Sequence, residues 1–225
     1  FWQPFCKLDE YKNVSMKKFV VLVVVSLSMS LCVTAQDFEG IIEFKKQEGK
    51  VVENTVWYVK GDLVRIDEFE PGSRMLKSAT ILNLKDSSIT YLDHQSKTWS
   101  RVKNHLVVAG APVNFSVTET KNTKELHTYK TTESVIKTGG DSTFSYWTNT
   151  GKFGFFRTAL YLYGPRNSYL EYYWMLKPKD NSMPMLVTKQ NLKGEETGRM
   201  EVTRIEKRTV DEKLFGVPAD YKEKK

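Results

Sequence analysis

Three histidines are the residues in this chain best suited to hold a metal ion or to act as a general base. They are His94, His105 and His127, and no two of them have the close spacing that brings two imidazoles to one face of a helix. Because zinc needs several ligands that converge on one point, this spacing predicts structural or surface roles and no metal site.

Serines and carboxylates show no arrangement that is typical of an enzyme. The Gly-x-Ser-x-Gly turn of many serine hydrolases does not occur in the sequence. Neighbouring acids such as Asp67 and Glu68 would point to opposite faces of a strand, because successive side chains alternate, and we expect them to be solvated charges at its edge. Arg65 and Asp67 would share one face, where a surface or cross-strand ion pair is the simplest expectation. We therefore predict a protein that is not an enzyme and that carries no cofactor or metal.

An aromatic segment is the strongest chemical signal in the chain. Nine of the 26 residues from Lys152 to Lys177 are aromatic. Their expected role is to fill the inside of a curved sheet, because aromatic side chains bury large areas. Alternatively, part of this lining stays accessible to an apolar or amphiphilic guest, such as the acyl chain of a lipid or lipoprotein. The residues expected to bind that guest are Phe153, Phe155, Tyr163, Tyr169 and Trp174.

The first 35 residues have the pattern of an export signal. Met16–Lys18 supplies a basic start, and the apolar run Phe19–Leu31 follows it. Small residues at Val33 and Ala35 predict cleavage before Gln36. A membrane anchor is the competing interpretation, but at about 1.5 Å per residue the run covers roughly 20 Å, less than the ~30 Å hydrocarbon core.

The signal divides the chain into three parts. Residues 1–15 precede Met16 without periodicity, and we expect them to lie outside the mature protein. Residues 16–35 form the signal peptide, and residues 36–225 form a single domain. A lipid-modified Cys32 is a further alternative, although the bulky Leu31 before it argues against lipidation.

N-terminal sequencing of the exported protein is expected to begin at Gln36, because signal peptidase cleaves after the small residue Ala35. A start at Phe1 would support the membrane anchor instead. An acylated Cys32 would support the lipoprotein alternative.

The mature chain is only mildly basic. Residues 1–35 contain four lysines and two acids, so 30 Lys and Arg remain against 25 Asp and Glu. These charges are spread over alternating positions, which argues against nucleic acid as a partner. Both cysteines, Cys6 and Cys32, lie in the part expected to be removed, which excludes disulfides and thiolate chemistry from the mature protein.

Alternating apolar and polar residues predict that most of the chain is strand. Short turn signals such as Gly61–Asp62 make neighbouring strands antiparallel. The expected strands are 38–45, 52–60, 63–69, 79–84, 89–93, 98–102, 127–137, 143–148, 183–192 and 198–207.

Two stretches depart from this alternation. Phe153, Phe156, Leu160 and Tyr163 recur at helical spacing, which predicts a helix that ends at Gly164. The spacing turns Phe156 inward, whereas Phe153 is one of the residues expected to line an accessible site. Phe156→Ala is therefore expected to destabilise the fold more than Phe153→Ala. Residues 104–123 lack a regular pattern and are expected to form a crossing segment or a short helix.

Four short fragments carry a family resemblance. They are Phe38–Ile41, Tyr58–Asp67, Tyr146–Thr148 and Leu214–Lys222. With them the chain resembles a family of exported domains of unknown function that is grouped with lipoprotein carriers of the LolA and LolB type. The resemblance implies a mainly β fold, in which a strongly curved antiparallel sheet forms an open half-barrel with one or two short helices against its concave face. It carries over no functional residue.

These observations lead to two functional hypotheses. The first is an exported, non-enzymatic protein that binds an apolar or amphiphilic ligand, a lipid or a lipoprotein acyl chain, inside a half-barrel. Its expected location is the periplasm or the outside of a Gram-negative bacterium. The alternative is an envelope protein that binds another protein, with a filled core and no ligand.

Overall fold

The computed structural model describes residues 38–103, 114–140, 142–164 and 169–224. The predicted export signal, residues 16–35, lies outside the described residues. Residues 104–113 of the irregular stretch also lie outside them.

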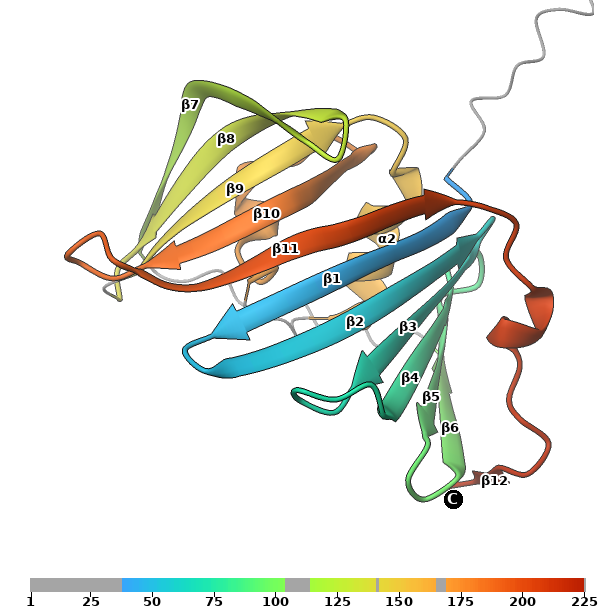
Figure 1. Cartoon of the computed structure of the whole chain (residues 1–225). Coiled ribbons are helices and arrows are strands. Elements are labelled where there is room, and N and C mark those ends of the chain that lie inside the picture. Colours follow the sequence, from blue (N-terminus) through green and yellow to red (C-terminus); the bar gives the residue numbers. More distant parts are fainter. Residues whose placement is uncertain (1–37, 104–113, 141, 165–168, 225) are drawn as a thin grey trace, which may run out of the picture. The chain divides into compact units, whose positions relative to one another are not determined.

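The described strands form one open 12-stranded sheet in the order β12-β6-β5-β4-β3-β2-β1-β11-β10-β9-β8-β7 (Figure 1). The strands are β1 Gly40–Glu48, β2 Val51–Lys60, β3 Leu63–Phe69, β4 Leu76–Asn83, β5 Ser88–Asp93, β6 Thr98–Lys103, β7 Phe115–Leu126, β8 Tyr129–Thr138, β9 Thr143–Thr150, β10 Ser182–Gln190, β11 Glu196–Lys207 and β12 Lys222–Glu223. Neighbours are antiparallel except β12, which runs parallel to β6. Pairing of β1 with β11 joins two meanders into one sheet.

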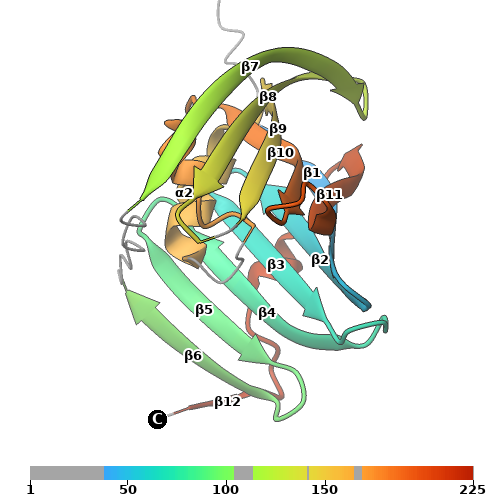
Figure 2. The same cartoon turned by 90° about the vertical axis from the view of Figure 1, so that its left-hand side faces the viewer.

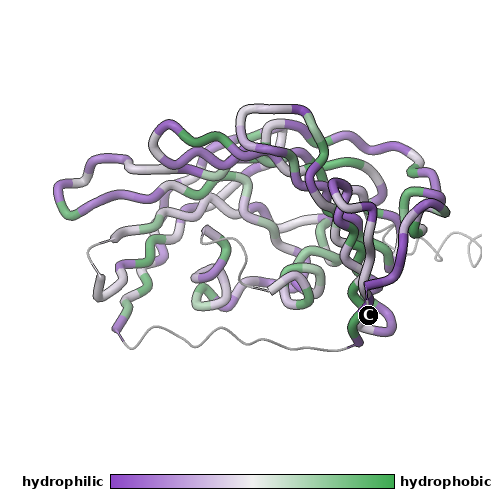
Figure 3. Tube along the Cα trace, turned by 90° about the horizontal axis from the view of Figure 1, so that it is seen from below, coloured by the Kyte–Doolittle hydropathy of each residue, from purple (hydrophilic) through white to green (hydrophobic). Residues whose placement is uncertain are grey.

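Helix α2, Gly154–Tyr163, lies against the concave side of this sheet (Figures 1 and 2). It ends at Gly164, whose φ of 75° and N–H bond to the Leu160 carbonyl close the last turn. The short 3₁₀ helix η2, Tyr173–Leu176, follows it, and Figure 3 shows the sheet arching over both. The predicted mainly β half-barrel with short helices on its concave face is confirmed.

The face of α2 that points to the sheet is buried. Its buried residues are Phe155, Phe156, Ala159, Leu160, Leu162 and Tyr163. Phe156 stacks on Trp57 of β2 with ring centroids 5.4 Å apart. The helix is therefore held by packing, because it has neither a side-chain cap nor an acidic residue in its first turn.

Strand β7 corrects the expectation for residues 104–123. Residues 115–123 are strand, whereas a crossing segment or short helix was expected. Most of β7 is exposed because it is an edge strand, so its sequence lacks the apolar alternation that marks a half-buried strand.

The turn between β7 and β8 is a second correction. The strand expected from His127 begins at Tyr129, because His127 and Thr128 form the turn with φ of 51° and 66°. Two-residue hairpin turns of this kind usually carry Asn or Gly, so the sequence contained no turn signal here. His127 donates from Nε2 to the Val202 carbonyl of β11 at 2.6 Å.

The fragment Phe38–Ile41 has a structural explanation. Gly40 has a φ of 153°, and a Cβ at this position would overlap the carbonyl oxygen of Glu206 in β11. Phe38 packs on Phe153 with centroids 5.5 Å apart, and Glu39 accepts a hydrogen bond from the Val210 N–H at 3.0 Å. The fragment thus ties β1 to the end of β11 and to the aromatic segment.

The last described part of the chain packs against the outer face of β3, β4 and β5. We call residues 208–224 the C-terminal strap; it contains the 3₁₀ helix η3, Glu212–Phe215, and β12. Apolar side chains of β4 and β5 that point away from α2 pack against it. This second cluster contains Ala79, Ile81 and Leu92, with Trp99, Phe215, Val217 and Tyr221 against them.

Arg65 and Asp67 form an ion pair, but it is buried beneath the strap, whereas a surface or cross-strand pair and a solvated Asp67 were expected. Arg65 Nε lies 2.6 Å from Asp67 Oδ1, and each side chain is only 8% exposed. The guanidinium also donates to the Leu214 carbonyl of the strap at 2.8 Å. Tyr221 hydrogen bonds to His94 nearby, and burial lowers the pKa of this histidine. Two of the fragments that carry the family resemblance, Tyr58–Asp67 and Leu214–Lys222, are therefore in direct contact.

Candidate functional site

The five aromatic residues expected to bind a ligand lie in or against the main core. Phe153, Phe155, Tyr163 and Tyr169 are buried, and Trp174 is half-buried. Phe153 is fully enclosed, with the rings of Phe38 and Tyr129 5.5 and 5.4 Å away. The structure brings these residues together as core, and their binding of a ligand stays a prediction.

Tyr169 shows how closely the aromatic segment fits the sheet. Its backbone carbonyl accepts a hydrogen bond from the Tyr146 hydroxyl at 2.8 Å, and its own hydroxyl donates to the Gln47 carbonyl at 3.4 Å. Gly198 of β11 makes room for that hydroxyl, which a Cβ at residue 198 would overlap. Burial raises the pKa of Tyr169 to about 12, so the hydroxyl remains a donor at physiological pH.

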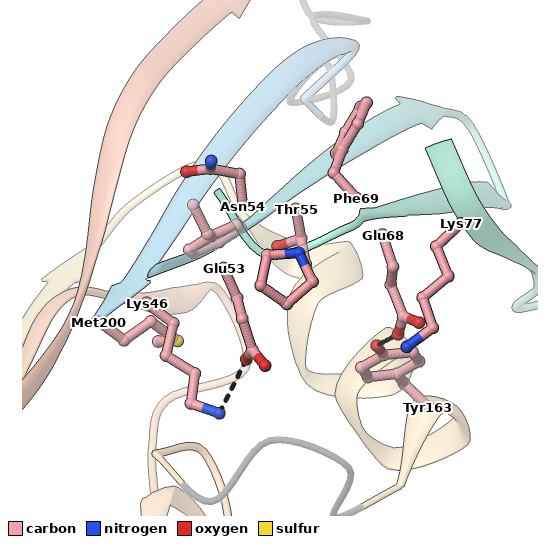
Figure 4. A pocket seen from close by; sticks show the side chains of 11 residues that line it. Lys46, Glu53, Asn54, Thr55, Glu68, Phe69, Lys77, Tyr163 and Met200 are labelled. Carbon is pink, nitrogen blue, oxygen red and sulfur yellow. Dashed lines mark hydrogen bonds and ion pairs between the residues drawn. The ribbon is translucent and has the colours of Figure 1, made fainter. Parts of the chain in front are cut away.

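A cavity of about 260 Å³ lies on the concave side between the sheet and the end of α2 (Figure 4). We call it the concave-face pocket. Its apolar lining is Phe44, Phe69, Pro71, Tyr163 and Met200, and its polar lining is Lys46, Glu53, Asn54, Thr55, Glu68 and Lys77. The lining comes from β1, β2, β3, β4, β11, α2 and the turn after β3.

The charged groups of the pocket are arranged in two sets. Lys46 Nζ lies 3.0 Å from Glu53 Oε2, because the two residues are paired across β1 and β2. Glu68 accepts hydrogen bonds from the Ser78 hydroxyl at 2.7 Å and from the Tyr163 hydroxyl, and Lys77 extends toward it in Figure 4. The pocket therefore combines an apolar wall with two polar positions, which suits a molecule that has both an apolar and a charged part.

Of the expected site residues, only Tyr163 lines this pocket. The alternation along β1 and β2 places Phe44 with Lys46, and Glu53 with Thr55, on one face of each strand. In the register of β1 and β2, Phe44 lies opposite Thr55 and Lys46 lies opposite Glu53. That register is the signal that sequence reasoning missed.

A second cavity, of about 340 Å³, lies over β4, β5 and β6. Its lining is richer in hydroxyl groups, which come from Ser78, Thr80, Tyr91, Thr98 and Ser100. Within the part of the chain that the structure describes, no cluster of His, Cys, Asp and Glu could hold a metal ion. No helix in those same ranges is both long enough and apolar enough to cross a membrane.

Comparison with protein families decides the relationship of the chain. A family model described as "Domain of unknown function (DUF4412)" matches residues 38–221. The chain belongs to the DUF4412 family. The expected membership in a family of unknown function is thus confirmed, and the matched residues include the three fragments Phe38–Ile41, Tyr58–Asp67 and Tyr146–Thr148, together with Leu214–Tyr221.

Several solved structures are similar to this DUF4412 domain at low sequence identity. An uncharacterized conserved protein from Thermus thermophilus has 11% identity and a TM-score of 0.47, with 82% of this chain and 90% of that chain covered. The Pseudomonas aeruginosa MucA/MucB complex has 8% identity and a TM-score of 0.46, with 83% and 58% covered. A DUF1329 family protein from Desulfovibrio piger has 8% identity and a TM-score of 0.32, with 85% and 94% covered. No curated protein matches the chain.

Proposed function

We propose that this DUF4412 protein is an exported, non-enzymatic binding protein of the Gram-negative cell envelope. Its ligand is an amphiphile, the acyl chain of a lipid or of a lipoprotein together with the adjoining polar group. The binding site is the concave-face pocket, and the aromatic segment acts as the floor that supports it.

The observation that carries this proposal is the composition of the pocket. An acyl chain would lie against Phe44, Phe69 and Met200, while its polar end would meet Lys46 or Lys77. Ligand sites are commonly apolar cavities with a few oriented polar groups, and this cavity approaches the lower end of their usual size of about 300 Å³.

Filling the pocket is expected to weaken binding without unfolding the protein. Thr55 lines the cavity from β2, so an indole at this position would occupy the space of the ligand. We expect Thr55→Trp to reduce affinity for a fluorescent fatty acid on the order of tenfold, which corresponds to about 1.4 kcal/mol. Fluorescence titration measures this affinity, and a thermal melt measures stability, which is expected to change by less than about 1 kcal/mol.

Thr118→Trp supplies the control, since Thr118 is an exposed threonine of the edge strand β7 and does not line the pocket. It should bind the fatty acid as the native protein does. Equal affinity in native protein and Thr55→Trp would show that the dye binds elsewhere and would exclude the pocket as the site.

A second candidate is an envelope protein that binds another protein and has no ligand. The observation that favours it is the complete burial of Phe153 and Phe156, which leaves neither ring accessible to a ligand. The same titration separates the two functions, because a protein with a filled core and no ligand would bind the fatty acid weakly and equally in all three forms.

A further inference from the structure

Exposed apolar side chains gather at one end of the sheet. Among the described residues, Val51, Met75 and Leu192 are the three most exposed large hydrophobics, at 52%, 62% and 79%. Each lies in or beside a turn between antiparallel strands, namely β1–β2, β3–β4 and β10–β11. Figure 1 shows these three turns at the same end of the sheet. We call residues 48–51, 70–75 and 191–195 the turn rim.

The three turns are also joined to one another. Lys189 at the end of β10 pairs with Glu48 at the end of β1, with Nζ and Oε1 3.3 Å apart. The Gly72 N–H of the β3–β4 turn donates to the Val52 carbonyl at 3.1 Å. The exposed side chains therefore belong to one continuous edge of the domain.

Each turn repeats the same pair, an exposed base directly beside an exposed apolar residue. The pairs are Lys50–Val51, Arg74–Met75 and Leu192–Lys193. Throughout the described ranges, no ion pair is formed by any of these three bases.

The acids of the rim, in contrast, have partners. Glu48 is held by Lys189, Glu70 accepts from Gln95 Nε2 at 2.9 Å, and Glu195 accepts from Asn191 Nδ2 at 2.8 Å. Only Glu48 is neutralised, because its partner Lys189 is charged, whereas the neutral amides leave the charges of Glu70 and Glu195 in place. Three unpaired bases therefore face two charged acids, and the small excess of positive charge lies directly beside the apolar tips.

We propose that the turn rim docks on the surface of an anionic lipid bilayer. The tips are separate side chains on separate turns, so each can insert between lipid molecules, whereas a rigid protein partner would need three matching pockets. Basic residues beside such tips meet the phosphate groups, and lysine and arginine side chains can reach the headgroups while their stems follow the apolar residue. This docking is independent of the concave-face pocket and of any ligand in it.

Binding to vesicles tests the proposal. The protein is used as recovered after export, so that all variants share one N-terminus, and is sedimented with vesicles of phosphatidylcholine alone or with added phosphatidylglycerol. Binding is expected only with phosphatidylglycerol and should weaken as salt is raised.

The triple variant Lys50→Gln, Arg74→Gln, Lys193→Gln should bind about a hundredfold more weakly, from roughly fivefold for each base near an anionic surface. The triple variant Val51→Ser, Met75→Gln, Leu192→Gln should also lose binding.

A charge-matched control comes from the opposite end of the sheet. Lys85, Lys130 and Lys207 are exposed there, so Lys85→Gln, Lys130→Gln, Lys207→Gln removes the same charge from a different edge. This variant should retain most of the binding. The proposal is overturned if native protein does not sediment with anionic vesicles, or if the control loses as much binding as the rim variant. Every substituted side chain is exposed, and circular dichroism checks that each variant is folded.

Discussion

Arg65→Ala is expected to lower the free energy of unfolding by about 3–5 kcal/mol, because it leaves the Asp67 carboxylate and the Leu214 carbonyl beneath the C-terminal strap without their shared donor. Burial already raises the pKa of Asp67, and the Arg65 charge offsets part of that rise. Without Arg65 the folded-state pKa rises further. A group whose pKa is raised by folding contributes its full stability below the pKa it has in the unfolded chain, and this contribution is lost as the pH increases. The loss of unfolding free energy in Arg65→Ala should therefore become smaller as the pH is lowered and Asp67 is protonated. Urea denaturation at several pH values measures both effects.

A double variant distinguishes a lost ion pair from simple loss of packing. Arg65→Met with Asp67→Leu removes both charges and keeps much of the volume, and such replacements are often neutral. It should recover part of the loss, with about 1–3 kcal/mol remaining because the Leu214 carbonyl still lacks its donor. A double variant as unstable as Arg65→Ala would mean that charge compensation is not what holds the strap.

The strap also shows where sequence reasoning reached its limit. The fragment Leu214–Lys222 is one of the four that carry the family resemblance, but its place on the outer face of β3–β5 depends on a contact between residues 149 positions apart, Arg65 and Leu214. No local pattern encodes such a contact. The strands themselves were predictable wherever one face is buried, since alternation reports burial directly. Alternation did not predict β7, because both faces of this strand are largely exposed.

The candidate site followed the same rule. Helical spacing identified α2, and with it Tyr163, because the helix buries one face in the core. Most of the remaining pocket lining is spread over five strands, whose relative positions depend on register. The turn rim is likewise assembled from three turns that are distant in sequence. Pro71 in the β3–β4 turn belongs to both the rim and the pocket, so an amphiphile held in the pocket would lie beside the proposed membrane surface.

The aromatic segment provides the second large expected effect. Phe156→Ala and Phe153→Ala should each lower the free energy of unfolding by about 3–5 kcal/mol, because both rings are completely buried and their removal leaves cavities. The sequence had predicted a smaller effect for Phe153, on the assumption that it faces an accessible site. In the structure Phe153 contacts Phe38, Phe155 and Tyr129, which surround it from the start of β1, from α2 and from β8.

Tyr161 is the matched control, since it is an aromatic residue of the same helix whose side chain is exposed. Tyr161→Ala should change stability by less than about 1 kcal/mol, as expected for a surface position. Urea denaturation of the three variants measures these differences. A loss below about 1 kcal/mol in Phe153→Ala would show that its ring is not part of the packed core and would return it to the set of ligand-binding residues. A loss equal to that of Phe156→Ala would remove Phe153 from the set of ligand-binding residues, because its ring would then be part of the packed core.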